Sequence, residues 1–140
     1  ITHLEWFRRQ DGTIAISEVA ARPPGAQITS LLGYAHDVDF YKAWVRIVGL
    51  DQFEIPKRKY ATGAAYLRGQ GGSQVADVHG LAQAQKELGS LVVEARLPQP
   101  GQPKAKGYEG EGFAILRHED TEVVREGLRR LVTLTRVEMA

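Results

Sequence analysis

The chain has 140 residues, a length typical of a single domain, and its 43% hydrophobic and 25% charged residues exclude a disordered or fibrous protein. Its 18 Lys and Arg residues nearly balance its 17 Asp and Glu residues, so nucleic acid and anionic membranes, which need a basic surface, are not expected partners. The absence of cysteine excludes disulfides, thiolate metal sites and a Cys nucleophile. No apolar run reaches membrane-spanning length and no signal peptide opens the chain, so we expect a cytoplasmic protein.

The first 20 residues predict an antiparallel β-hairpin. Residues 1–9 and 13–20 carry many β-branched and aromatic side chains, and Gln10-Asp11-Gly12, which contains the strong turn signal Asp-Gly, separates them. We take Asp11 and Gly12 as the two central residues of the turn, which fixes the register. Because side chains alternate along a strand, this register places three cross-strand pairs on one face: His3 with Ala20, Glu5 with Glu18, and Phe7 with Ile16.

The paired carboxylates of Glu5 and Glu18 suggest a cation site. Like charges directly opposite each other destabilise a sheet, and a partly apolar face increases that cost. A divalent cation removes the repulsion, and Mg²⁺ prefers one or two carboxylates together with phosphate oxygens. Arg22 lies four residues beyond Glu18, just past the strand end, where its guanidinium can contact the same phosphate. A metal and an arginine around a phosphoryl group stabilise its transfer electrostatically.

Two helices are predicted after the hairpin. Arg22-Pro23-Pro24-Gly25 ends the second strand, because proline fixes φ and lacks an N–H donor. From Ala26 the apolar residues take helical spacing up to His36-Asp37, and a second helix is predicted from about Val38 to the capping Gly49. The second helix has a wide apolar stripe, so we expect it to be well buried, with Trp44 in the core. Its members are Val38, Phe40, Tyr41, Trp44, Val45, Ile47 and Val48.

The remaining residues predict an α+β layer with the order ββαββα. A polar, basic connector at 51–59 marks a sub-domain boundary, and strands at 60–68 and 74–78 flank a glycine-rich hairpin turn at 69–72. A short helix at 81–88, a strand at 91–97, a loop at 98–112 and a strand at 113–117 follow. The last helix begins at Asp120 or Thr121, and its inner face is predicted to hold Val124, Leu128, Leu131 and Leu134.

The first part of the chain resembles the C-terminal strand pair of the ATP-grasp superfamily, which includes biotin carboxylase, D-alanine-D-alanine ligase and the L-amino acid ligases. The similarity lies in the sequence His-Leu-Glu-Trp-Phe and in the stretch from Asp11 to Gly25, with the family pattern Glu-x-Asn-x-Arg followed by glycine. It implies that Glu5 and Glu18 bind Mg²⁺ or Mn²⁺ and that Arg22 faces the acyl phosphate and the γ-phosphate of ATP. Ala20 stands where the pattern has Asn, which leaves one or two metals open and is closer to the carboxylate-amine ligase branch.

The resemblance also implies a domain organisation and a function. Residues 1–50 would be the C-terminal portion of an ATP-grasp fold, an antiparallel hairpin plus two helices; 51–59 would be the connector, and 60–140 an α+β sub-domain. The chain starts without Met on strand residues, so we expect the family's glycine-rich flap and phosphate-binding lysines to lie upstream. We therefore expect this chain to be part of an ATP-dependent carboxylate-amine or carboxylate-thiol ligase that forms an acyl phosphate from small substrates. The chain alone is expected to be inactive. The alternative is a non-catalytic lid, scaffold or oligomerisation module, and a homo-oligomer is compatible with either.

Simpler interpretations stand beside each functional one. Glu5 and Glu18 can also be a solvated surface pair, Arg22 a salt-bridging arginine, and His3 either a structural residue or a substrate contact. His36, His79 and His118 have no ligand spacing, so we expect loop or cap roles for them. The glycines at 69–72 lack the Gly-Lys-Ser/Thr ending of a phosphate loop, which favours a hairpin turn.

Overall fold

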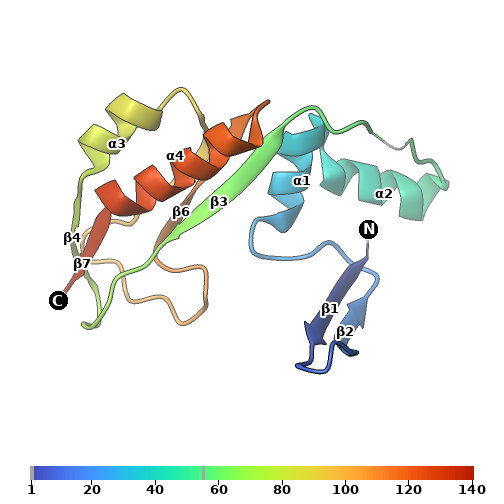
Figure 1. Cartoon of the computed structure of the whole chain (residues 1–140), viewed down its shortest axis with the longest axis horizontal. Helices are drawn as coiled ribbons and strands as arrows, with labels where there is room; N and C mark the ends of the chain where they lie inside the picture. The colour runs from blue at the N-terminus through green and yellow to red at the C-terminus, as the bar shows by residue number, and fades with distance from the viewer. Residues whose placement is uncertain (1, 55) are drawn as a thin grey trace.

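The computed structural model describes residues 2–54 and 56–140. Within them, seven strands form three separate antiparallel sheets, β1-β2, β3-β6-β5 and β4-β7, and Figure 1 shows the hairpin set apart from the larger β3-β6-β5 sheet. The elements in chain order are β1 (His3–Arg8), β2 (Ile14–Ala20), α1 (Ile28–His36), α2 (Phe40–Leu50), β3 (Ala61–Leu67), β4 (Val75–His79), α3 (Leu81–Leu88), β5 (Val92–Arg96), β6 (Gly112–His118), α4 (Thr121–Leu134) and β7 (Arg136–Met139).

The main core lies between the three-stranded sheet and helices α3 and α4. The central strand β6 is buried on both faces, which explains its uninterrupted apolar run, and Ile115 and Leu116 are fully buried. Helix α4 begins where the Asp120 side chain accepts a hydrogen bond from Glu122 N at 2.7 Å. The predicted inner face of α4 is confirmed: Val124 and Leu131 are buried in this core, and Leu128 and Leu134 pack against it.

The opposite face of the same sheet holds α1. On β3, Thr62 and Tyr66 alternate with the residues that face α4, and both bond to the segment around α1. Thr62 Oγ1 donates to Leu31 O at 3.1 Å, and the Tyr66 hydroxyl donates to Ala26 O. Tyr34 of α1 donates to Glu94 of β5 at 2.9 Å. Residues 26–36 are therefore fastened to the α+β part, while the predicted boundary at 51–59 stays a prediction.

The predicted hairpin between the strands flanking 69–72 is wrong. β3 pairs with β6, whereas β4 pairs with β7, a four-residue C-terminal strand that was not predicted. The chain end lies against the glycine-rich turn, where Ser73 N donates to Ala140 O at 2.6 Å. The alternation of Arg136-Val137-Glu138-Met139 was the available signal for β7, and Val137 packs with Leu67 and Val75 in a second small core. The α+β part is thus ββαββαβ.

The predicted burial of the second helix is also wrong. Helix α2 starts at Phe40 because the Asp39 side chain caps it, accepting from Lys42 N at 2.9 Å. No residue of α2 is buried, and its outer stripe is widely exposed: Tyr41 55%, Val45 61% and Val48 70%. Trp44 is half-buried rather than a core residue. Helical spacing predicted the helix correctly, but among the described elements only α1 packs substantially against it.

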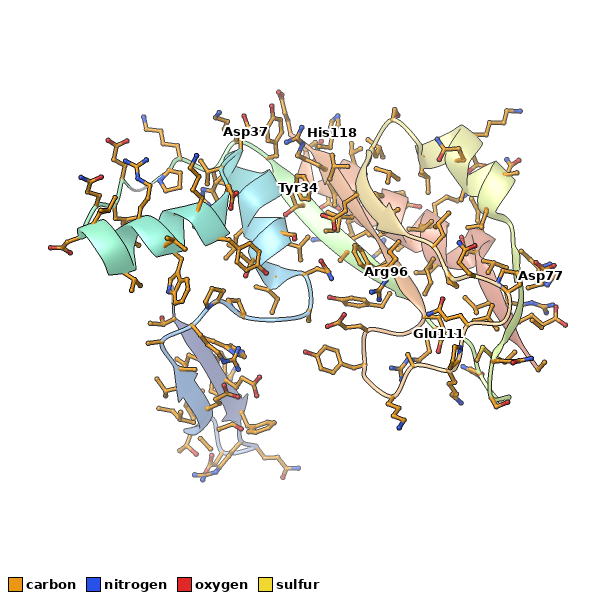
Figure 2. All side chains as sticks on the ribbon, turned by 180° about the vertical axis from the view of Figure 1, so that it is seen from behind. Tyr34, Asp37, Asp77, Arg96, Glu111 and His118 are labelled. Atoms are coloured by element: carbon orange, nitrogen blue, oxygen red, sulfur yellow. The ribbon has the colours of Figure 1, made fainter. Side chains whose placement is uncertain are left out.

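The long loop between β5 and β6 is anchored by a buried carboxylate (Figure 2). Glu111 is only 1% exposed. Its two carboxylate oxygens accept hydrogen bonds from Gly69 N at 2.8 Å and Ala105 N at 3.0 Å, and its backbone carbonyl accepts from Gln102 Nε2 at 2.8 Å. Glu111 therefore ties the loop to the segment that links β3 with β4.

Candidate metal centre

The register of the hairpin brings Glu5 and Glu18 together. Glu5 faces Glu18 and His3 faces Ala20, so these two predicted pairs are confirmed. The third predicted pair is wrong, because Phe7 faces Ala15 and Ile16 faces Trp6.

Two irregularities in the hairpin explain this mixed outcome. The turn is longer than predicted, since it is closed by Arg9 N donating to Thr13 O at 2.8 Å. The Asp11 side chain accepts from Thr13 Oγ1 at 2.7 Å and from Thr13 N at 2.9 Å, and these bonds lower the pKa of its carboxyl. A β-bulge that leaves Ser17 unpaired then shifts the register by one residue. Beyond the bulge, the pairing at Glu5 and Glu18 is the predicted one.

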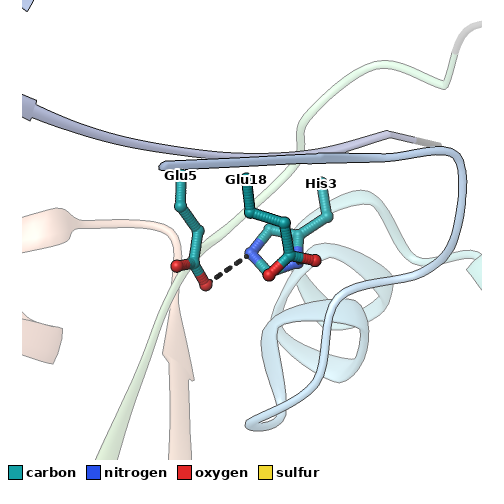
Figure 3. Close-up of side chains that lie close together, drawn as sticks. All are labelled: His3, Glu5 and Glu18. Atoms are coloured by element: carbon teal, nitrogen blue, oxygen red, sulfur yellow. Dashed lines mark ion pairs between the residues drawn. The ribbon is translucent and has the colours of Figure 1, made fainter. Parts of the chain in front are cut away.

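Three side chains converge on one face of this hairpin (Figure 3). His3 Nε2 lies 3.2 Å from Glu5 Oε1, and His3 Nδ1 lies 3.8 Å from Glu18 Oε1. One ligand atom from each of His3, Glu5 and Glu18 lies within 4.8 Å of the others, and no other group of three His, Asp or Glu residues in 2–54 and 56–140 does so. The imidazole is the most buried of the three, with 17% of its side chain exposed against 51% for Glu5 and 40% for Glu18.

Arg22 completes the cluster from just beyond the strand end. Its Nη2 donates to Glu18 Oε1 at 2.7 Å, and its Nη1 donates to Pro23 O at 3.2 Å. A guanidinium has five N–H donors, so these two bonds leave further donors for another anion. Arg22 is thus the charged group that offsets the repulsion between the two carboxylates.

The donor set fits a divalent cation. Six ligands around Mg²⁺ lie at about 2.0–2.1 Å from the ion, so ligand atoms on opposite sides are roughly 4 Å apart. The spacing within the cluster, all within 4.8 Å, needs only small side-chain movements to reach that geometry. The partial exposure of both carboxylates also leaves room for phosphate or water to complete the coordination.

Of the other histidines, His36 and His118 end α1 and β6, whereas His79 lies on strand β4 and not in the loop or cap expected for it. His36 Nδ1 lies 3.1 Å from Pro56 O, and His118 Nδ1 accepts from Asp120 N at 3.0 Å beside the start of α4. His79 lies on β4, where its Nε2 is 2.6 Å from Glu138 Oε2 and its Nδ1 is 3.7 Å from Asp77 Oδ2. In addition, none of the described helices has both the length and the apolar character needed to cross a bilayer.

The fold is that of the C-terminal part of ATP-grasp enzymes, which confirms the fold expected from the hairpin motif. The chain resembles the L-amino acid ligase from Bacillus licheniformis with a TM-score of 0.74 at 17% identity. It resembles N5-carboxyaminoimidazole ribonucleotide synthetase from Thermotoga maritima (0.65, 19%) and phosphoribosylglycinamide synthetase from Anaerococcus prevotii (0.66, 13%). In each case the match covers 99% of this chain, and this chain spans 37% of the length of the other protein. Comparison of the sequence with protein families and with curated proteins gives no match.

Proposed function

We propose that this chain supplies the metal- and phosphate-binding hairpin of an ATP-dependent carboxylate-amine or carboxylate-thiol ligase. The observation that carries the proposal is the pairing of Glu5 with Glu18, with Arg22 bonded to Glu18 at 2.7 Å, in a chain with an ATP-grasp fold. The three similar proteins named above are ATP-grasp ligases, which supports the same reaction class for the protein to which this chain belongs.

Each residue has a distinct role in that reaction. Glu5 and Glu18 would hold Mg²⁺ or Mn²⁺, which when bound neutralises charge on the phosphates of ATP. A substrate carboxylate oxygen attacks the γ-phosphorus, so that an acyl phosphate forms and ADP leaves. An amine or thiol then attacks the acyl carbon, loses its proton and releases inorganic phosphate. Arg22 places its free N–H donors against the transferring phosphoryl group and the developing charge on the acyl group.

Exposed apolar side chains support a location beside further protein. Thirteen of the sixteen large apolar side chains that are exposed in the described residues lie between Leu4 and Phe53. Leu4, Trp6, Ile16 and Val19 gather on the hairpin face away from the carboxylates, and α2 adds its outer stripe. Apolar patches of this kind mark interaction surfaces. An ATP-binding part that carries the nucleotide contacts would cover them, and the chain without that part is proposed to be inactive.

The coding sequence upstream of Ile1 gives the first test. A glycine-rich flap and phosphate-binding lysines encoded in frame with this chain support the ligase, whereas an unrelated domain there contradicts it. The second test uses the protein that contains both parts. It should release ADP only when Mg²⁺ and a carboxylic acid are both present, and hydroxylamine should trap the acyl phosphate as a hydroxamate. ADP release that is independent of any carboxylate contradicts the acyl phosphate route.

A further inference from the structure

We propose that His3 is a third ligand of the metal held by Glu5 and Glu18, and that its nitrogen shifts the site toward Mn²⁺ and Co²⁺ relative to Mg²⁺. The proposal rests on the metal role proposed above for the two carboxylates. It assigns to His3 a direct bond to the ion rather than a hydrogen bond to its neighbours.

The cross-strand register places His3 at the point where the second strand offers no ligand. His3 faces Ala20, whose methyl group can neither donate to nor bind an ion. The imidazole therefore has this side of the cluster to itself, and it lies between the two carboxylates (Figure 3).

The hydrogen bonding of His3 is incomplete, which favours a ligand role. Nε2 lies within bonding distance of Glu5, but Nδ1 is buried and has no hydrogen-bond partner among the described residues. Glu18 Oε1 is 3.8 Å from Nδ1, too far for a hydrogen bond. A buried nitrogen without a partner costs free energy, and coordination of a cation that is shared with Glu18 removes that cost.

The choice of ion follows from ligand chemistry. Mg²⁺ prefers oxygen ligands and binds nitrogen weakly, whereas affinity for a site with an imidazole rises from Mn²⁺ to Co²⁺ and beyond. Two carboxylates alone provide no such discrimination against Mg²⁺. One imidazole ligand should therefore change the ratio of the Mn²⁺ affinity to the Mg²⁺ affinity more clearly than it changes either affinity alone.

Mn²⁺ bound to the 140-residue chain provides the test, measured by electron paramagnetic resonance. Wild-type protein should bind Mn²⁺ with a ¹⁴N coupling that changes to a ¹⁵N pattern when the histidines are ¹⁵N-labelled, a readout that needs no substitution. His3→Phe should abolish the nitrogen coupling and weaken Mn²⁺ binding about tenfold or more, with a smaller change for Mg²⁺. His79→Phe is the matched control, because His79 also lies between two carboxylates on a strand pair, and it should leave both signals unchanged.

The outcomes separate the two proposals. Mn²⁺ binding that Glu18→Gln abolishes, but that shows no nitrogen coupling in the labelled wild type, overturns the ligand role of His3 and leaves the carboxylate site intact. A nitrogen coupling that persists in His3→Phe overturns it too. A wild-type chain that binds no Mn²⁺, or binds it equally well after Glu18→Gln, overturns the metal role of the carboxylates and with it the proposed function of the hairpin.

Discussion

Replacement of Glu111 with Gln removes a charge from a carboxylate that is 1% exposed and accepts two backbone hydrogen bonds. Gln can accept only one of these bonds, and its amide NH₂ faces the other N–H, which is left unsatisfied. A hydrogen bond to a charged group contributes about 1.5–3 kcal/mol and a buried unsatisfied donor costs about 1–3 kcal/mol. Glu111→Gln should therefore lower the free energy of unfolding at pH 7 by about 3 kcal/mol. The exposed Glu119, changed to Gln, is the control and should be nearly neutral.

The effect of Glu111 should depend on pH. Burial raises the pKa of its carboxyl, but the bonds from Ala105 N and Gly69 N outweigh burial, so the folded-state pKa lies below its usual value. A depressed pKa stabilises the folded state above the unfolded-state value, near pH 4.3, and this contribution disappears as pH falls through the folded-state pKa. The difference between wild type and Glu111→Gln should accordingly be full at pH 7 and shrink in acid.

Urea unfolding followed by far-ultraviolet circular dichroism measures both effects. Tryptophan fluorescence is unsuitable, since Trp6 and Trp44 lie on β1 and α2, away from the loop that Glu111 anchors. A difference below about 0.5 kcal/mol at pH 7, within the range of ordinary surface substitutions, would refute the anchoring role of Glu111. A difference that stays constant from pH 7 to pH 3 would refute the electrostatic part of the reasoning.

Three further predictions concern other parts of the chain. Gly80→Ala should lower the free energy of unfolding by at least about 2 kcal/mol in the same urea assay, because φ at Gly80 is +81° and the new Cβ would lie 1.9 Å from Leu134 O. Gly49 lies in open space within α2, so Gly49→Ala should instead raise the free energy of unfolding by about 0.5–1 kcal/mol. The hydrogen bonds from Arg130, and then from Gln83, lower the pKa of Glu87 to about 2, so Arg130→Gln should raise it toward 4.5 in an NMR pH titration, and an unchanged value contradicts the ion pair. Val19 is 69% exposed on the apolar hairpin face. Val19→Lys should therefore reduce self-association of the chain and its binding of a fluorescent dye that binds apolar surfaces, without changing its helix content. Undiminished dye binding contradicts the assignment of that face as an interaction surface.

The hairpin shows how far turn chemistry determines a site. Asp11-Gly12 and strand alternation predicted Glu5 opposite Glu18 with His3 on the same face, and both are observed. The observed hairpin differs from the predicted one in two features, a longer turn and a bulge at Ser17, whose effects on the register cancel at Glu5 and Glu18. Neither leaves a distinctive sequence signal, because a bulge depends on how the strand bends against its surroundings.

The errors in the remaining fold are all errors about non-local partners. The glycine-rich turn predicted that β3 and β4 pair with each other. Instead, β3 pairs with β6 and β4 pairs with β7, both of which lie later in the sequence. Helical spacing predicted α2 correctly and said nothing of what covers its stripe at Tyr41, Val45 and Val48. The sequence did not predict the buried role of Glu111 either. One of its two donors, Gly69, is far away in the sequence, and the other, Ala105, lies in an irregular loop. Local rules predict elements and their ends, whereas pairing and burial depend on residues far away in the chain.

Turnover of Mg-ATP by a Glu18→Gln variant tests the two-carboxylate site most directly, in the protein proposed to carry this chain together with an ATP-binding part. Glu138→Gln, in the other strand-pair cluster with a histidine, is the control. Under the proposed metal role, loss of one of the two carboxylates removes electrostatic stabilisation of the transferring phosphoryl group, so kcat should fall about 100-fold or more, while Glu138→Gln keeps wild-type turnover. Unchanged turnover of Mg-ATP by Glu18→Gln would contradict the metal role of the hairpin.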